Sequence, residues 1–286
     1  MKHSAFTVLF PNKNLEEVFS LLAKLNYDGV EVRVKEDYHV PPGAVRSHVR
    51  RLRELGERYK LEIPVLATYL SITEQEALFP IFEAADQLGA KGVRVSLGPP
   101  LDGRKPYWTL LPEVQRALDM FIKTLKPFKV KALFEIHFRT LISSPSLAYL
   151  LLKPFDPAKI GVIYDPGNMI IEGREDWKLG VGVVKNYLSH VHVKNASWVK
   201  EKRWIWRWDE LKLGMADWEE IMGALLSINY DGYLSNENLC GVDLPGATGF
   251  VGERLSSGDK SPEPIEEKLA EDLRYLKELE KYLKGG

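Results

Sequence analysis

Four short segments of this sequence place carboxylates or imidazoles at the end of an apolar, β-branched run. Such side chains are costly at the end of a buried strand unless a cation neutralises and orients them. Four strand ends of this kind in succession therefore predict one metal site, at a spot toward which parallel strands converge. The four segments are Glu135-Ile-His137, Asp165-Pro-Gly-Asn168, His190-Val-His192-Val-Lys194 and Ser235-Asn-Glu237.

Residues two apart in a strand point to the same face of the sheet, and this rule tests the predicted site. Glu135 shares a face with His137, and His192 shares one with His190 and Lys194. If these side chains faced outward, they would meet the apolar layer between the strands and the helices of a barrel. We therefore expect them to point inward and to cluster.

The available ligand types narrow the choice of metal. The sequence contains one cysteine, Cys240, so no intramolecular disulfide can form and the ligands must be His, Asp or Glu. Of the pair His190 and His192, we expect His192 to bind the ion because it lies nearer the strand end, and His190 to hydrogen-bond structurally. Three carboxylates with one imidazole suit one divalent ion, Mn²⁺ first, with Mg²⁺, Co²⁺ or Zn²⁺ as alternatives.

Short β-rich runs alternate with longer helical patterns, as in parallel strands joined by crossover helices. Eight such pairs without a break in composition predict an α/β fold, a single (β/α)8 TIM barrel domain over residues 1–286. A doubly wound dinucleotide-binding sheet is disfavoured because no Gly-x-Gly-x-x-Gly follows the first strand. The expected strands are residues 6–10, 29–33, 62–68, 92–96, 132–137, 160–165, 188–194 and 232–237.

Helices are expected between these strands. Asn14 can cap the first of them. Pro80, Pro112 and Pro145 each suit the first turn of a later helix, where the missing backbone N–H costs nothing. The expected helices are residues 15–25, 43–59, 80–88, 112–125, 145–152, 176–186, 217–228 and a final outer helix at 263–284.

Two segments exceed ordinary loop length, residues 196–213 after the seventh strand and 239–264 after the eighth. Both would lie over the face where barrel enzymes keep their sites. The second, rich in Gly, Ser and Pro, could be a lid or a disordered loop. The first contains four tryptophans, which could form an aromatic wall over a sugar or a contact between subunits of a homo-oligomer: Trp198, Trp204, Trp206 and Trp208.

Charge and hydropathy exclude several classes of partner. Lys and Arg number 39 against 40 Asp and Glu, so the formal charge of −1 supplies no long-range field for a nucleic acid. No run approaches the roughly 20 apolar residues of a membrane span, and the N-terminus lacks a long apolar signal segment. We expect a cytoplasmic protein that binds neither nucleic acid nor membrane.

The ordered set of segments resembles the xylose isomerase-like TIM barrel superfamily, which comprises sugar phosphate isomerases and epimerases, keto-acid or keto-inositol dehydratases and endonuclease IV. The resemblance covers nearly the whole chain and includes Tyr27-Asp-Gly-Val-Glu31 and Leu213-Gly-Met-Ala-Asp217-Trp218 besides the strand ends above. It implies an endonuclease IV-like barrel fold and four metal ligands: Glu135, Asp165, His192 and Glu237.

The chain also departs from this superfamily. Asn168 stands where many members have a histidine, and an amide cannot shuttle a proton near neutral pH. Trp198 stands near the place of an arginine that ketose 3-epimerases usually carry. Both departures disfavour ketose 3-epimerase activity. His137 matches the catalytic base of the dehydratase branch.

The leading hypothesis is a metal-dependent isomerase or epimerase of a sugar, sugar phosphate or sugar acid. Glu135 and Glu237 would exchange protons on the two faces of a metal-bound enediolate, with His137 assisting. A dehydratase of a cyclic keto acid or keto-inositol is the first alternative. An endonuclease IV-like hydrolase and a barrel that only binds a ligand are further alternatives.

Four cations at or just beyond strand ends suggest an anionic substrate. The competing interpretation is that each pairs with a nearby carboxylate, for example Arg33 with Glu31. Lys194 is the strongest candidate because it shares a face with His192. The fourth cation of the set is Arg139. The residues expected to contact the substrate are Lys194, Arg33, Arg94, Asn168 and Trp198.

Overall fold

The computed structural model describes residues 1–98, 101–242 and 264–285. Its central sheet is made of strands β1 (Lys2–Phe6), β2 (Gly29–Val34), β3 (Val65–Ser71), β4 (Gly92–Ser96), β5 (Lys131–Glu135), β6 (Ile160–Tyr164), β7 (Leu188–Val193) and β10 (Tyr233–Asn236). These strands are parallel and close into a barrel in the order β1-β10-β7-β6-β5-β4-β3-β2. The predicted (β/α)8 barrel is therefore confirmed.

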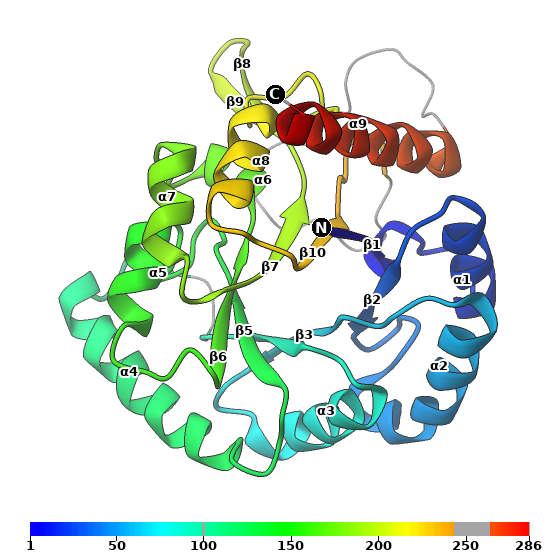
Figure 1. Ribbon diagram of the computed structural model, residues 1–286. Coiled ribbons are helices and arrows are strands. Elements are labelled where there is room, and N and C mark those ends of the chain that lie inside the picture. Colours follow the sequence, from blue (N-terminus) through cyan, green and yellow to red (C-terminus); the bar gives the residue numbers. More distant parts are fainter. Residues whose placement is uncertain (99–100, 243–263, 286) are drawn as a thin grey trace.

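Helices surround the barrel as an outer ring (Figure 1). Asn14 caps the first one as predicted, because its side chain accepts from Glu17 N at 3.0 Å while Glu17 Oε2 accepts from Asn14 N at 2.7 Å. The helices are α1 (Leu15–Lys24), α2 (Val45–Tyr59), α3 (Gln75–Leu88), α4 (Tyr107–Thr124), α5 (Pro145–Leu152), α6 (Pro166–Ile171), α7 (Trp177–Val184), α8 (Trp218–Ser227) and α9 (Ile265–Gly285), with 3₁₀ turns η1 (Thr7–Leu9) and η2 (Pro42–Ala44).

The first strand lies four residues earlier than predicted, at Lys2–Phe6 instead of 6–10. The hydropathy pattern favours the apolar run that follows, because the strand itself contains the polar residues Lys2, His3 and Ser4. That run forms η1, which is buried, and Thr7 Oγ1 there accepts a hydrogen bond from Arg33 N at 2.8 Å. The apolar residues thus mark a buried turn at the mouth of the barrel.

Two helices begin five residues before the prolines that were expected to start them. Pro80 lies inside α3 and Pro112 inside α4. A proline that deep removes a backbone hydrogen bond, a cost that the packing of the surrounding apolar face must offset. Pro145 does occupy the first position of α5, as predicted.

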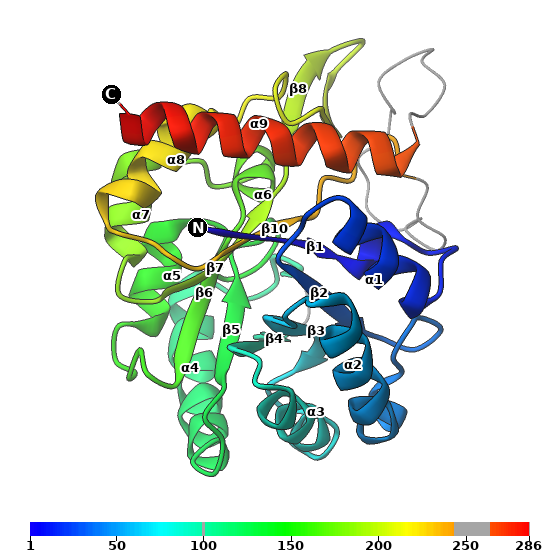
Figure 2. The same ribbon diagram turned by 45° about the vertical axis from the view of Figure 1, so that its right-hand side comes forward.

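The long segment after β7 is a hairpin of strands β8 (Ala196–Lys200) and β9 (Trp204–Trp208), although the sequence interpretation treated it as a loop. The two strands pair antiparallel, with Trp198 opposite Trp206. In Figures 1 and 2 the hairpin projects beyond the ring of helices. Alternation of tryptophans at 204, 206 and 208 is a strand signal that could have revealed it.

The final outer helix is α9, which packs beside α8 (Figure 2). Its Glu280 accepts a bond from the N-terminal amine at 2.9 Å, which ties the two ends of the chain together. Of the predicted lid at 239–264, residues 243–263 lie outside the described part of the chain. Among the described helices, none combines the length and apolar character that a membrane crossing requires.

Candidate metal centre and active-site pocket

The structure brings together the four residues expected to bind metal. Glu135, Asp165, His192 and Glu237 come from the carboxyl ends of β5, β6, β7 and β10, all are buried, and one ligand atom of each lies within 4.8 Å of the others. His192 Nδ1 is the centre of the group. It lies 3.2 Å from Glu135 Oε1, 3.4 Å from Asp165 Oδ2 and 3.0 Å from Glu237 Oε2.

The Asp165-Pro-Gly-Asn168 segment is shaped to present a carboxylate. Asp165 caps α6, because its Oδ1 accepts from Asn168 N at 2.8 Å, and this leaves Oδ2 facing His192 and Lys194. Gly167 is required by a close approach. A Cβ at that position would lie 2.7 Å from Lys194 Cγ, so a larger residue would displace the lysine.

Two buried cations partly neutralise the cluster. Lys194 Nζ lies 2.8 Å from both Asp165 Oδ2 and Glu237 Oε2. Arg94 forms an ion pair with Glu135, with its Nε 2.6 Å from Oε2, and donates to Thr68 O at 3.0 Å. Arg94 therefore pairs with a carboxylate, as in the competing interpretation of the four strand-end cations.

These contacts set the direction of the pKa shifts. Burial alone would raise the pKa of Glu135, but Arg94 and His192 hold it well below its ordinary value. Glu237 follows the same pattern, because Lys194 and His192 outweigh burial and lower its pKa. Burial raises the pKa of Asp165, which Lys194 only partly offsets. Hence Glu135 and Glu237 are held ionised, as ligands for a cation must be.

The donor set fits a divalent ion. Three carboxylates and one imidazole nitrogen are the ligand types that Mn²⁺, Mg²⁺, Co²⁺ and catalytic Zn²⁺ accept. Glu237 Oε2 is buried and makes no hydrogen bond of good geometry to any described residue, although the nitrogens of His192 and Lys194 lie near it. A divalent ion held by these four residues would satisfy this acceptor.

A pocket of about 1210 Å³ opens above this cluster, and Glu135 and Glu237 form part of its wall. The β8–β9 hairpin contributes Trp206 and Trp208, whose rings are 5.1 Å apart. The ring centres of Phe138 and Trp206 are 5.6 Å apart, and Lys194 Nζ lies 4.9 Å from the centre of the Trp208 ring. The pocket thus has an aromatic wall beside its charged floor, and its volume suffices for a sugar-sized ligand.

Trp198, which was expected to contact the substrate, is not part of the described pocket wall. Its indole Nε1 donates to Ile170 O of α6 at 2.8 Å, so the ring covers that helix. Trp206 and Trp208 line the pocket wall, where Trp198 was expected to lie. The sequence could not distinguish them, because which tryptophans face the pocket depends on how the hairpin folds back.

Asn168 and His137 both line the pocket. Asn168 is fully buried and donates to Glu135 Oε1 at 2.9 Å, so its amide already holds a carboxylate of the cluster. β5 ends at Glu135, two residues earlier than predicted, and His137 follows it in a half-buried position. His137 Nδ1 lies 2.8 Å from Phe138 O, which indicates a proton on Nδ1 and leaves the Nε2 lone pair available as a base.

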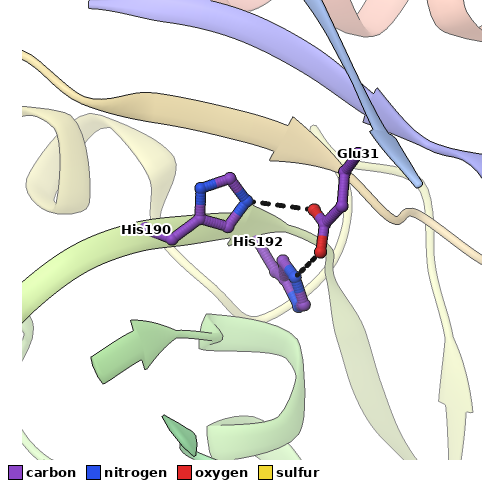
Figure 3. Close-up of side chains that lie close together, drawn as sticks. All are labelled: Glu31, His190 and His192. Carbon is purple, nitrogen blue, oxygen red and sulfur yellow. Dashed lines mark hydrogen bonds and ion pairs between the residues drawn. The ribbon is translucent and has the colours of Figure 1, made fainter. Parts of the chain in front are cut away.

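The competing interpretation, in which Arg33 pairs with Glu31, does not hold. Glu31 contacts two histidines instead, with Oε2 3.0 Å from His190 Nε2 and Oε1 3.3 Å from His192 Nε2 (Figure 3). Arg33 lines the pocket with Lys35 and Tyr69, two residues that the sequence interpretation missed. Arg139, at a positive φ of 59° beyond β5, is not among the pocket-lining residues of the described chain.

The closed parallel barrel, with a buried carboxylate and histidine cluster at its carboxyl end, defines an α/β barrel with a candidate metal centre. Residues 19–279 match the xylose isomerase-like TIM barrel family, so the chain belongs to this family. No curated protein matches the sequence significantly.

Several solved structures share the fold. D-psicose 3-epimerase from Clostridium cellulolyticum H10, solved with D-tagatose, has a TM-score of 0.74 at 15% identity over 98% of this chain and 99% of its own. The probable 3-DHS dehydratase from Bacillus anthracis has a TM-score of 0.72 at 15% identity over 97% and 99%. A xylose isomerase-like barrel protein from Mycobacterium smegmatis, solved in complex with magnesium, has a TM-score of 0.71 at 16% identity over 99% and 97%. At these identities the likeness shows the fold alone.

Proposed function

We propose that the protein is a divalent-metal-dependent isomerase or epimerase of a sugar, sugar phosphate or sugar acid. The observation that supports this most directly is the four-residue cluster itself. Three carboxylates and His192 Nδ1 converge at the base of a pocket that also has an aromatic wall. Apolar sugar faces pack on indole rings, and sugar hydroxyls suit carboxylates and a cation.

A bound divalent ion would act as a Lewis acid on the substrate oxygens and orient them. The residues that would hold it are Glu135, Asp165, His192 and Glu237. Mn²⁺ is our first choice, and the magnesium complex of the Mycobacterium smegmatis protein makes Mg²⁺ a natural second probe.

Glu135 and Glu237 are the candidate proton carriers. They come from β5 and β10, which are separated by β6 and β7 in the barrel, so a substrate carbon can lie between them. Arg94 and Asn168 orient Glu135, while Lys194 and His192 orient Glu237. Each carboxylate would remove or return a proton on its own face of the carbon next to the carbonyl.

The test is incorporation of solvent deuterium. The Mn²⁺-loaded protein is incubated in D₂O with a panel of ketoses, their phosphates and sugar acids, and carbon-bound deuterium is measured by NMR. We expect exchange at a carbon beside the carbonyl of at least one compound, at a rate well above that with Asp165→Asn protein. Metal-loaded protein that exchanges no member of the panel would contradict the proposal.

A dehydratase is the second candidate, and His137 favours it. This residue lines the pocket with a tautomer that leaves Nε2 basic, as a proton abstraction followed by loss of water would require. One structure of the same fold is described as a probable 3-DHS dehydratase. Water loss creates a conjugated double bond, so a rise in ultraviolet absorbance with a keto acid, without isomer interconversion, would favour this candidate.

A further inference from the structure

Two cations at the end of β2 face the pocket and form no ion pair with a carboxylate of the described residues. Arg94 and Lys194 are engaged by the metal-binding carboxylates, whereas Arg33 and Lys35 form no ion pair with any described residue. Arg33 Nε is buried and has no hydrogen-bond partner within residues 1–98, 101–242 and 264–285. Partly desolvated guanidinium groups are rarely left unpaired, because burying a donor without an acceptor costs free energy.

Aromatic rings hold these cations in place. The Arg33 guanidinium carbon lies 4.5 Å from the centre of the Tyr38 ring and 5.1 Å from that of Tyr69. Lys35 Nζ lies 5.9 Å from the same Tyr69 ring. Burial and the charge of Arg33 lower the pKa of Lys35, and Asp37 opposes them only partly. Two like charges thus stand side by side around one ring, an arrangement that an anion would stabilise.

The charge balance of the pocket points the same way. With a divalent ion bound, Arg94, Lys194 and the ion would exceed the charge of the three carboxylates of the cluster by one positive charge. Arg33 and Lys35 add two more, against Glu74, whose carboxylate accepts a bond from Ser71 N at 2.7 Å. Asp102 and Arg104 pair with each other at 3.3 Å. A neutral sugar would leave this excess uncompensated.

We propose that Arg33 and Lys35 form a subsite for an anionic group of the substrate, a phosphate or a carboxylate. This inference rests on the proposed function for the identity of the rest of the substrate. Phosphate sites of TIM barrels frequently lie after strands seven and eight. Here the tryptophan hairpin follows the seventh barrel strand, and the unpaired cations lie at the second.

Calorimetric binding to the Mn²⁺-loaded protein tests the subsite without requiring turnover. The probes are inorganic phosphate, D-fructose 6-phosphate, D-gluconate and neutral D-fructose. We expect a charged sugar to bind on the order of 10-fold or more tightly than D-fructose, since hydrogen bonds between charged groups are stronger than those between neutral groups. Preference for D-fructose 6-phosphate or for D-gluconate separates phosphate from carboxylate.

Arg33→Gln combined with Lys35→Gln should remove this preference, and Arg33→Lys should retain part of it. Arg139→Gln is the matched control, because Arg139 also follows a strand end but does not line the pocket formed by the described residues. Unchanged Mn²⁺ affinity shows that a variant is folded at its site. Equal affinity for charged and neutral sugars, or no charged probe bound, would overturn the subsite. Charge-dependent binding without deuterium exchange would instead overturn the proposed reaction.

A second inference concerns the buried cluster of Glu31, His190 and His192 shown in Figure 3. Glu31 is fully buried, and its two oxygens each face the Nε2 atom of one imidazole. The separations of 3.0 and 3.3 Å between these oxygens and nitrogens are those of hydrogen bonds.

The bond to Glu31 determines which nitrogen of His192 can bind metal. If Nε2–H donates to Glu31, the lone pair stays on Nδ1, the atom that faces Glu135 and Glu237. His190 donates to the other carboxylate oxygen and so prevents Glu31 from rotating away. We propose that Glu31 is a positioning residue, which holds His192 in the tautomer and orientation needed at the metal centre.

Metal affinity tests this role directly. Glu31→Gln protein should bind Mn²⁺ on the order of 10- to 100-fold more weakly, the range found when a partner behind a ligand histidine is lost. Nitrogen NMR of the Zn²⁺-loaded wild type should show His192 protonated at Nε2. His190→Gln, which leaves the bond between Glu31 and His192 intact, should have a smaller effect.

Thermal melting of both variants reports folding separately from binding. Unchanged Mn²⁺ affinity in folded Glu31→Gln protein would overturn the positioning role. Two ions bound per wild-type chain, with the second lost in Glu31→Gln, would also overturn it, since these three residues would then be ligands of a second metal.

Discussion

Glu237→Gln protein loaded with Mn²⁺ is expected to exchange deuterium on the order of 10³-fold more slowly than the wild type. The substitution preserves the size of the side chain but removes its charge and its basicity. Glu237 Oε2 lies 2.8 Å from Lys194 Nζ and 3.0 Å from His192 Nδ1, so the variant also weakens the attraction that holds Lys194 in place. Exchange is measured by NMR at saturating Mn²⁺, with bound metal counted in each sample.

Glu74→Gln is the matched control for this variant. Glu74 lines the same pocket, but its carboxylate accepts from Ser71 N and is not one of the four candidate ligands. Its exchange rate should stay within about threefold of the wild type, because a single neutral-for-charged replacement outside the reacting groups changes little. Metal-loaded Glu237→Gln protein that exchanges at the wild-type rate would remove Glu237 from the mechanism.

Glu135→Gln extends the same experiment to the opposite face of the substrate. If each carboxylate serves one face, either variant should block interconversion of the two isomers. One variant should still exchange deuterium when the reaction starts from one isomer. The other variant should still exchange it when the reaction starts from the other isomer. Identical losses from both isomers would indicate that one carboxylate acts alone.

Removal of the metal is expected to abolish exchange and to lower the melting temperature. Without the ion, the buried carboxylates of Glu135, Asp165 and Glu237 depend on Arg94 and Lys194 for compensation. An ion present at 100 times its dissociation constant stabilises the folded state by about 2.7 kcal/mol. For a chain of this size the corresponding change in melting temperature is on the order of 5–10 °C.

Calorimetry before and after treatment with EDTA, followed by addition of Mn²⁺, measures both effects. Asp165→Asn protein should melt at nearly the same temperature with and without chelator, because it lacks one ligand. Asp119→Asn, which alters an exposed ion pair with Lys123, should respond like the wild type. Full exchange activity in a sample shown to be free of metal would contradict the metal centre.

Local patterns predicted most of the secondary structure. β4 at Gly92–Ser96 has the predicted bounds, and the Asn14 capping box is a signal contained within four residues. The first strand was missed because its residues are polar and the buried turn after it is apolar. The hairpin was missed because a long connection was assumed to be irregular. In both cases, tertiary packing determined which pattern formed a strand.

The candidate site was likewise predicted in part from local patterns and determined in part by tertiary contacts. Alternation along each strand and the order of the segments sufficed to identify the residue types that meet at the carboxyl end of the barrel, because side-chain direction in a strand is a local property. The choice of partners was not local. Glu31 reaches His190 across 159 positions of sequence, which no spacing rule predicts.

By itself, then, the sequence determined an eight-stranded barrel with carboxylates and imidazoles at the ends of its later strands. Only the tertiary structure decided that Glu31 contacts the histidines, that Arg33 lines the pocket, and that tryptophans 206 and 208 form part of the wall. The physical reason is closure of the barrel. Hydrogen-bonded register between strands brings distant residues within contact distance, and that register is a property of the whole sheet.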